Sequence, residues 1–284
     1  METATKIIRN RICLFFDFDG TLGPDTTRTF FEAHDIPFED FHHRLNERID
    51  QFWQYPLAKA DLLREYSHRE DSLVRRRELE AFGAEFPLFE GVETLVERLR
   101  EDAREIDEEI ELEFIMLTAG FKSIPENSVV GKQFDRVYGG ELNFDHDGRV
   151  LGARRVISHV DKVHYIKQVA QGLDLNSASE LERTYVYRKP EDYYVPLSQV
   201  VYVGDGSSDM SAFQIVEEGG GIAIAIDPDP ESDWDGYEDI APGRRVHNIA
   251  EADYRDDSDL MRSLQLSVKS MIHRIQLLRM GEGQ

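Results

Sequence analysis

Short apolar runs alternate with amphipathic stretches along most of the chain. The runs are rich in β-branched and aromatic residues, which is typical of buried strands in a parallel sheet, and they cover residues 12–17, 112–117, 200–203 and 222–226. Between them, apolar side chains three or four residues apart predict helices over residues 90–110, 161–172, 209–218 and 260–280. This alternation predicts an α/β fold with a doubly wound, Rossmann-like parallel sheet.

The stretch between the first two predicted strands departs from this alternation. Its apolar residues keep helical spacing throughout, and it contains no convincing strand. Gly23 and Pro24 at one border, with Gly83 and Pro87 at the other, are typical of boundaries or hinges. The stretch is therefore predicted to be a helical insert. The predicted domains are an α/β core over residues 1–21 and 88–284 and a helical cap over residues 22–87.

Three other segments have simpler interpretations. Polar and apolar residues alternate over 141–151 around an Asp-His-Asp-Gly sequence, which predicts a hairpin turn. Asp145 and Asp147 would suit calcium, but the other ligands of a calcium loop are missing, so a turn is favoured. Residues 176–198 form an excursion without clear periodicity, and 227–243 are expected to be a loop rich in proline and acidic residues.

The net charge of the chain limits the classes of molecule that it is expected to bind. It has 56 acidic and 33 basic side chains and a formal net charge of −23. Such a surface repels nucleic acid and anionic lipid, so neither is expected as a general partner. Only eight of the basic residues are lysines. The composition fits a salt-adapted source and ordinary acidic solubility equally well.

The location is inferred from cysteine usage and hydropathy. The lone cysteine, Cys13, lies inside the first apolar run and has no partner for an internal disulfide. Neither the N-terminal stretch nor any other run has the apolar length of a signal peptide or a membrane span. We expect a cytoplasmic protein that is a monomer or a homodimer.

Acidic residues follow two of the predicted strands directly. Asp17 and Asp19 follow the first strand, and Asp205 and Asp209 follow the strand at 200–203. Carboxyl ends of parallel strands share one edge of the sheet, where ligands bind. Four carboxylates at that edge repel one another unless a cation lies between them, and hard oxygen ligands favour Mg2+ shared with a substrate phosphate. The sequence therefore predicts a magnesium site.

Each of these signals has an ordinary alternative. Asp17 and Asp19 would also fit a capped turn, and Asp209 would fit a helix N-cap. Thr118, followed by Ala119 and Gly120, could hold a phosphate oxygen or simply end a strand. Lys162 could neutralise clustered phosphate and carboxylate charge. It could equally be a surface lysine, with Lys167 as the competing candidate.

The order of these motifs resembles the haloacid dehalogenase superfamily of phosphohydrolases. The four motifs are Asp17-Phe18-Asp19-Gly20-Thr21, Thr118, Lys162 and Gly204-Asp205-Gly206-Ser207-Ser208-Asp209. The segments at 117–121, 144–150 and 204–210 are similar to those of phosphoserine-phosphatase-like members. The insert at 22–87 matches the position of the family's mobile cap.

The resemblance implies a role for each motif residue. Asp17 would be the nucleophile and, with Asp205 and the backbone carbonyl of Asp19, a Mg2+ ligand. Asp19 would be the general acid and base. Thr118, Ala119, Gly120 and Lys162 would bind the transferring phosphoryl group. Asp209 would complete the acidic cluster, through water or by orienting Lys162. The implied activity is hydrolysis of a small phosphomonoester through an aspartyl-phosphate.

Alternatives from other classes stay open. A phosphomutase or a carbon–halogen hydrolase of the same superfamily is one, although the acid at Asp19 disfavours a dehalogenase. A non-catalytic binding protein with an acidic site is another. The expected partner is a small phosphorylated metabolite that the motifs do not identify. Possible contacts from the cap are Arg44, Arg48, Trp53, Tyr55, Arg64 and Arg69.

Overall fold

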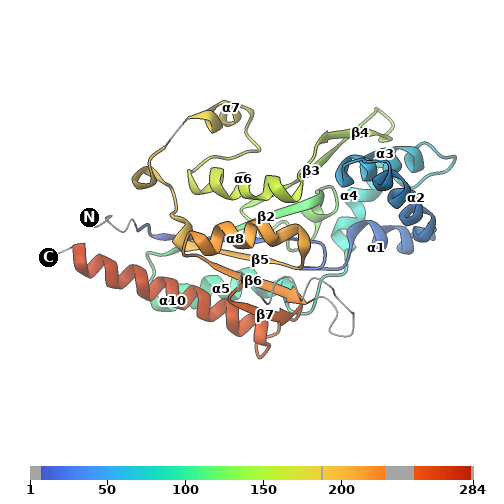
Figure 1. The fold of residues 1–284 in the computed structure, drawn as a ribbon. Coiled ribbons are helices and arrows are strands. Elements are labelled where there is room, and N and C mark those ends of the chain that lie inside the picture. Colours follow the sequence, from blue (N-terminus) through green and yellow to red (C-terminus); the bar gives the residue numbers. More distant parts are fainter. Residues whose placement is uncertain (1–7, 187, 228–245, 283–284) are drawn as a thin grey trace.

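The computed structural model describes residues 8–186, 188–227 and 246–282. A seven-stranded sheet lies at its centre in the order β4-β3-β2-β1-β5-β6-β7 (Figure 1). All neighbouring strands are parallel except β3 and β4, which form an antiparallel hairpin. The strands are β1 (Arg11–Phe16), β2 (Glu111–Phe121), β3 (Arg136–Phe144), β4 (Val150–Arg155), β5 (Val200–Gly204), β6 (Ile222–Asp227) and β7 (Asn248–Glu251). The predicted doubly wound α/β fold is confirmed.

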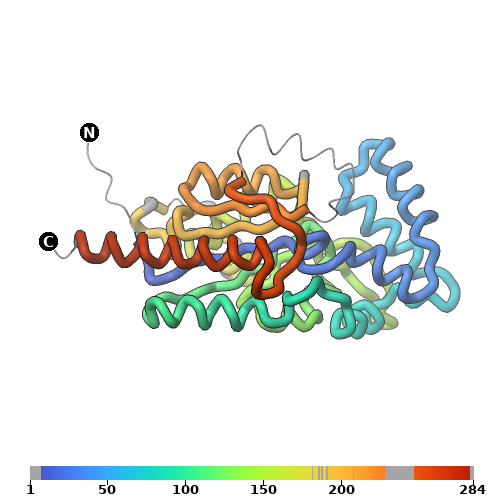
Figure 2. Tube along the Cα trace, turned by 90° about the horizontal axis from the view of Figure 1, so that it is seen from below, coloured from blue at the N-terminus to red at the C-terminus, as the bar shows by residue number. Residues whose placement is uncertain are grey.

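Helices cover both faces of the sheet because β1 is apolar on both sides. Alternate residues Ile12, Leu14 and Phe16 belong to one buried cluster, and Cys13 and Phe15 belong to the other, as the two-residue period of a strand requires. The first cluster includes α5 (Val92–Ile106) and α10 (Asp259–Glu282), which lie side by side in Figure 2. The second includes α6 (His159–Ala170) and α8 (Met210–Glu218).

Cys13 is buried inside β1, as expected for a structural thiol. Its Sγ donates to Oε2 of Glu113 at 3.6 Å. Burial and the neighbouring Glu113 carboxylate raise the pKa of the thiol well above its ordinary value. Cys13 is therefore an inert part of the core, since the thiolate is the reactive form.

The insert between β1 and α5 is helical, as predicted, and lies beyond one end of the sheet (Figure 1). Its helices are α1 (Thr26–Ala33), α2 (Phe38–Asp50), α3 (Tyr55–Ser67) and α4 (Arg76–Glu85). Phe31, Phe41 and Tyr66 from three of them meet with ring centroids 4.9 to 5.5 Å apart. These aromatic contacts hold three of the cap helices together and form part of the buried cluster that includes Ile12, Leu14 and Phe16. The limits of the cap at residues 22 and 87 stay a prediction.

The β3–β4 hairpin is bonded to the cap, which the sequence pattern does not indicate. The backbone N–H of Val150 donates to Oγ of Ser67 at 2.8 Å, and the ring of His68 lies 3.0 Å from the carbonyl oxygen of Val150. The N–H of Arg76 donates to the carbonyl oxygen of Gly148 at 2.9 Å. The hairpin therefore links the cap to the edge of the sheet.

Other elements differ from the sequence prediction in detail. Strand β2 continues past Thr118 to Phe121, and its pairing with β3 is irregular between Leu117 and Phe121. Strand β7 was not predicted, and α5 ends at Ile106 rather than at residue 110. The described residues of the excursion at 176–198 form only short helical turns, including α7 (Ala178–Leu181). The predicted loop at 227–243 lies almost wholly outside the described residues.

Within the described part of the chain, no helix combines the length and the apolar character needed to cross a membrane.

Candidate active site

The carboxyl ends of β1 and β5 bring three of the predicted acids together. Strands β1 and β5 are neighbours, and the N–H of Asp17 donates to the carbonyl oxygen of Val203 at 2.9 Å, which continues their ladder. Carboxylate oxygens of Asp17, Asp205 and Asp209 all lie within 4.8 Å of one another. The turns that follow two adjacent strands thus build one acidic cluster.

Two glycines permit this close approach. Gly20 has φ of +71°, and a Cβ there would lie 2.1 Å from Oδ2 of Asp205. A Cβ at Gly204 would lie 2.4 Å from Cγ of Asp209. A side chain at either position would displace a carboxylate, so glycine is a geometric requirement of the cluster.

Lys162 bridges two of the three acids. Its ammonium is fully buried and donates to Oδ2 of Asp17 at 2.7 Å and to Oδ1 of Asp209 at 2.6 Å. A capping box of Ser158 and Asp161 fixes the start of α6, which carries this lysine. The competing candidate, Lys167, is exposed. The structure therefore places Lys162, not Lys167, in the cluster.

Tyr202 is a further member of the cluster that sequence reasoning missed. Its hydroxyl donates to Oδ1 of Asp209, the oxygen that also accepts from Lys162, while the N–H of Gly206 donates to Oδ2 at 3.3 Å. Burial, and then the Asp209 carboxylate, raise the pKa of Tyr202 well above its ordinary value, so the hydroxyl stays a donor. The sequence did contain a signal for this residue, because Tyr202 has a polar hydroxyl within an otherwise apolar strand.

Asp19 is not part of the close group of three carboxylates and is bonded to the start of the cap instead. Its oxygens accept from the backbone N–H of Thr26 at 2.8 Å and from the Thr26 hydroxyl at 3.4 Å. The start of the cap helix α1 thus holds this side chain. This position is compatible with a metal contact through the backbone carbonyl of Asp19 rather than through its carboxylate.

Thr118, Ala119 and Gly120 line the same cavity as Asp17 and Asp19. The N–H of Gly120 donates to Oγ1 of Thr118 at 2.9 Å. A Cβ at Gly120 would lie 2.8 Å from Oδ2 of Asp19, so this segment also needs a glycine. The irregular pairing of β2 at this point brings the segment beside the acids.

Burial and mutual repulsion change the protonation of the acids. Burial raises the pKa of Asp17 to about 7; Lys162 opposes this shift and Asp209 adds to it. Burial and the charge of Asp25 raise the pKa of Asp19 to about 6. Burial, Asp17 and Asp209 raise the pKa of Asp205 well above its ordinary value. With Lys162 as the one cation bonded to them among the described residues, these acids therefore hold protons to a higher pH than isolated carboxyl groups do.

The donor set fits a magnesium ion. Among the described residues and side chains, Asp205 has neither a hydrogen-bond donor nor a basic side chain in contact with it. Its carboxylate is nonetheless close to those of Asp17 and Asp209. A hard divalent cation that prefers carboxylate oxygens would relieve this repulsion.

The cavity above the acids has a volume of about 750 Å³, and the cap forms one of its walls. Its lining residues from the cap are Asp25, Gln54, Tyr55, Pro56 and Lys59. Of the six cap contacts suggested by the sequence, only Tyr55 is among the described lining residues. The sequence analysis did not identify Lys59. Its position four residues before Leu63 places it on the buried face of α3, and this spacing was a signal in the sequence.

The four cap arginines suggested by the sequence contact other residues of the cap instead of lining the cavity. Arg44 and Arg48 form ion pairs with Glu65, and Arg48 and Arg64 form ion pairs with Asp61. The Arg69 guanidinium lies 3.5 Å from the centroid of the Tyr66 ring. These contacts stabilise the packing of α2 on α3 and leave the arginines away from the cavity.

The second acidic group, at Asp145, His146 and Asp147, behaves as a turn. Oδ1 of Asp145 accepts from the backbone N–H groups of Asp147 and Arg149 at 2.9 and 2.8 Å, and Gly148 has φ of +77°. This is the geometry that the hairpin prediction implied.

Known proteins share this fold. An apo phosphoserine phosphatase superposes with a TM-score of 0.54 at 16% identity, covering 87% of this chain and 96% of that chain. A probable phosphoserine phosphatase from Vibrio cholerae gives 0.55 at 14% identity, covering 94% and 68%. A HAD family hydrolase from Salmonella enterica serovar Typhi gives 0.56 at 11% identity, covering 86% and 68%. At these identities the likeness concerns the fold alone.

Sequence comparison gives the family. No curated protein matches the chain. The family model described as haloacid dehalogenase-like hydrolase matches residues 14–214, which include all four motifs. The resemblance predicted from the motifs is confirmed, and the chain belongs to the haloacid dehalogenase-like hydrolases.

Proposed function

We propose that this hydrolase is a Mg2+-dependent phosphatase that acts on a small phosphomonoester through an aspartyl-phosphate. The observation that carries the proposal is the bridge from Lys162 to Asp17 and Asp209, together with the cavity that Asp17, Asp205 and Thr118 line. A carboxylate nucleophile, a phosphate-binding cation and an acidic metal site then meet at one sheet edge.

In the proposed first step, a carboxylate oxygen of Asp17 attacks phosphorus and the bond to the leaving alcohol breaks. Asp19 gives its proton to the alcohol oxygen. In the second step, Asp19 accepts a proton from water, the water oxygen attacks phosphorus, and Asp17 is released with inorganic phosphate. A pKa of about 6 allows Asp19 to hold or release a proton near neutral pH.

The phosphoryl oxygens are held by groups on three elements. Lys162 supplies positive charge, and the Thr118 hydroxyl and the N–H groups of Ala119 and Gly120 supply donors. Asp17, Asp205 and the backbone carbonyl of Asp19 would hold Mg2+, with Asp209 orienting Lys162. The ion would supply charge neutralisation for the phosphoryl oxygens.

The proposed substrate is small because the cap covers the acids. Residues of α3 line the cavity, so a substrate reaches the acids only beside the cap. We place the cap at residues 22–87 and the core at 1–21 and 88–284. Such a cover excludes bulk water and adds contacts to the leaving group.

The proposal is tested by turnover of an aryl phosphate with Mg2+ and with EDTA. Release of phosphate only with Mg2+ is expected. A haloacid that released halide instead would identify a dehalogenase, and transfer of labelled phosphate to a second hydroxyl would identify a phosphomutase. A protein that bound phosphate without any turnover would be a binding protein.

A pH-dependent stabilisation by Mg2+ is a second expected result. The raised pKa of Asp17 means that the folded protein holds this proton more tightly than the unfolded chain, whose value is 3.8. This favours the metal-free fold at low pH, and the contribution is lost as pH rises through about 7. Mg2+ binds the ionised form, so its stabilisation should grow with pH.

Thermal melting at about pH 5.5 and about pH 8, each with and without Mg2+, measures this effect. The rise in Tm caused by Mg2+ should be larger at the higher pH, and Asp205→Asn should reduce it at both. An equal or larger rise at the lower pH would contradict a site formed by these carboxylates.

A further inference from the structure

Lys59 of the cap is a buried cation without a partner. Only 4% of its surface is exposed, and it lines the cavity above the acids. Among the described residues it forms no hydrogen bond and no ion pair within 4.0 Å, and the centroid of the Tyr55 ring lies 5.8 Å from its Nζ. Burying an unpaired ammonium is costly, so such a group indicates a missing anion.

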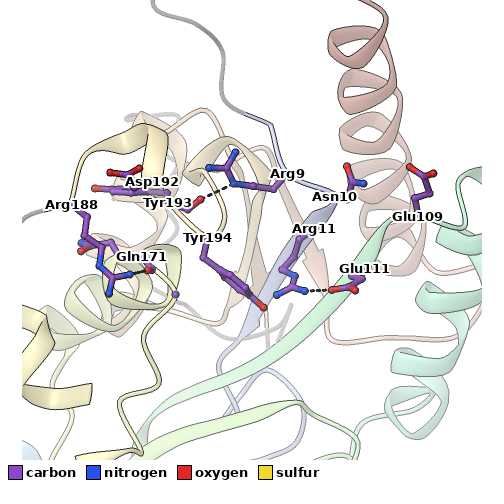
Figure 3. A pocket seen from close by; sticks show the side chains of 11 residues that line it. Arg9, Asn10, Arg11, Glu109, Glu111, Gln171, Arg188, Asp192, Tyr193 and Tyr194 are labelled. Carbon is purple, nitrogen blue, oxygen red and sulfur yellow. Dashed lines mark hydrogen bonds and ion pairs between the residues drawn. The ribbon is translucent and has the colours of Figure 1, made fainter. Parts of the chain in front are cut away.

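The arginines that line a second cavity already have partners. Figure 3 shows a second cavity at the opposite end of β1, where Arg9, Arg11 and Arg188 line the wall. Arg9 donates to the carbonyl oxygen of Tyr193 at 2.9 Å, Arg11 pairs with Glu111, and Arg188 donates to the carbonyl oxygen of Gln171. Lys59 differs from these residues because it lines a cavity and forms no hydrogen bond or ion pair with any described residue.

Lys59 remains charged in this position. Burial opposes its charge, but Tyr55 and the carboxylates of Asp25 and Asp19 outweigh burial and raise the pKa of Lys59 above its ordinary value. The Asp25 carboxylate forms no ion pair with Lys59 within 4.0 Å and caps α1 by accepting from the N–H of Arg28 at 2.6 Å. The positive charge is therefore available to a ligand.

The location of Lys59 indicates which part of a substrate it meets. The transferring phosphoryl group is assigned to Lys162 and Thr118 on the core. Lys59 lies on the cap wall of the cavity and interacts electrostatically with Asp19, the residue proposed to protonate the leaving group. The leaving alcohol would therefore extend towards Lys59.

We infer that Lys59 binds a second anionic group, a carboxylate or a phosphate, on the leaving-group side of the substrate. The inference rests on the proposed phosphatase function and gives it a substrate class: phosphomonoesters of alcohols that carry a negative charge. The ammonium would donate to the anion in the cavity, where low polarity strengthens a charge-assisted hydrogen bond.

The test compares three esters with the same reacting phosphate. Phosphoglycolate carries a carboxylate, ethane-1,2-diol bisphosphate carries a second phosphate, and ethyl phosphate carries neither. The variants are Lys59→Met, Lys59→Arg, which keeps the charge, and Lys132→Met, a control at an exposed lysine. Steady-state kcat/KM is measured for each intact protein with Mg2+.

Lys59→Met should lower kcat/KM on the preferred anionic ester by about tenfold to a hundredfold, the value of one charge-assisted hydrogen bond, and on ethyl phosphate by less than about threefold. Lys59→Arg should retain part of the preference, and Lys132→Met should behave as the parent does. Comparison of phosphoglycolate with the bisphosphate identifies the anion. An equal loss on all three esters would overturn the inference, because Lys59 would then act only through Asp19.

A binding measurement separates this inference from the proposed function. Phosphoglycolate should raise the Tm of the parent more than ethyl phosphate does, and Lys59→Met should remove the difference. If these Tm differences were observed but no ester were hydrolysed, the phosphatase proposal would be rejected and the anion site supported. Turnover without any such difference in the parent would reject the anion site alone.

Discussion

Asp17→Asn is expected to abolish phosphatase turnover and leave the fold intact. An amide is a poor nucleophile and a weaker metal ligand, so the covalent step would lose at least about a thousandfold in kcat. The side chain is nearly isosteric, and the N–H of Asp17 still continues the ladder to Val203. Steady-state hydrolysis of an aryl phosphate, with circular dichroism to monitor the fold, measures the effect.

The matched control is Asp147→Asn, which makes the same chemical change at an exposed turn. This variant should keep the parent's activity. Turnover of Asp17→Asn within about tenfold of the parent would contradict the assignment of Asp17 as nucleophile, since loss of a nucleophile costs far more.

Lys162→Met is expected to produce the largest loss of stability. The substitution removes the only cation that contacts Asp17 and Asp209 among the described residues and leaves two carboxylates buried without it. Removing one partner of a buried ion pair costs about 3–5 kcal/mol. Urea unfolding of the metal-free protein should show this loss, and turnover should fall as well, because the phosphoryl group loses its lysine.

Two comparisons test the electrostatic origin of this loss. Adding Asp209→Asn to Lys162→Met should restore part of the free energy of unfolding, because one unpaired charge is removed. Mg2+ should also reduce the deficit, whereas the exposed Lys167→Met should change stability by no more than about 0.5 kcal/mol. A stable Lys162→Met protein, or a double variant less stable than the single one, would contradict the interpretation.

The local patterns of the sequence were sufficient for the elements and for much of the candidate site. A strand buried on both faces is a continuous apolar run, so Ile12 to Phe16 predicted β1 and the acids at its end. Glycine beside aspartate after such a run predicted a sharp turn at the carboxyl edge. These signals depend only on residues that are close together in the sequence, so they can be recognised without knowledge of the tertiary structure.

The sequence by itself determined the alternation of strands and helices along most of the chain, the helical insert and the acidic residues at the ends of β1 and β5. Only the tertiary structure showed that Lys162 rather than Lys167 contacts the acidic cluster and that Tyr202 belongs to it. It also showed that Lys59, rather than the four cap arginines, lines the cavity. It also joined the β3–β4 hairpin to the cap. These choices depend on how elements far apart in the chain face each other, as with Asp17 and Lys162, 145 residues apart. Periodicity within one element carries no information on that orientation.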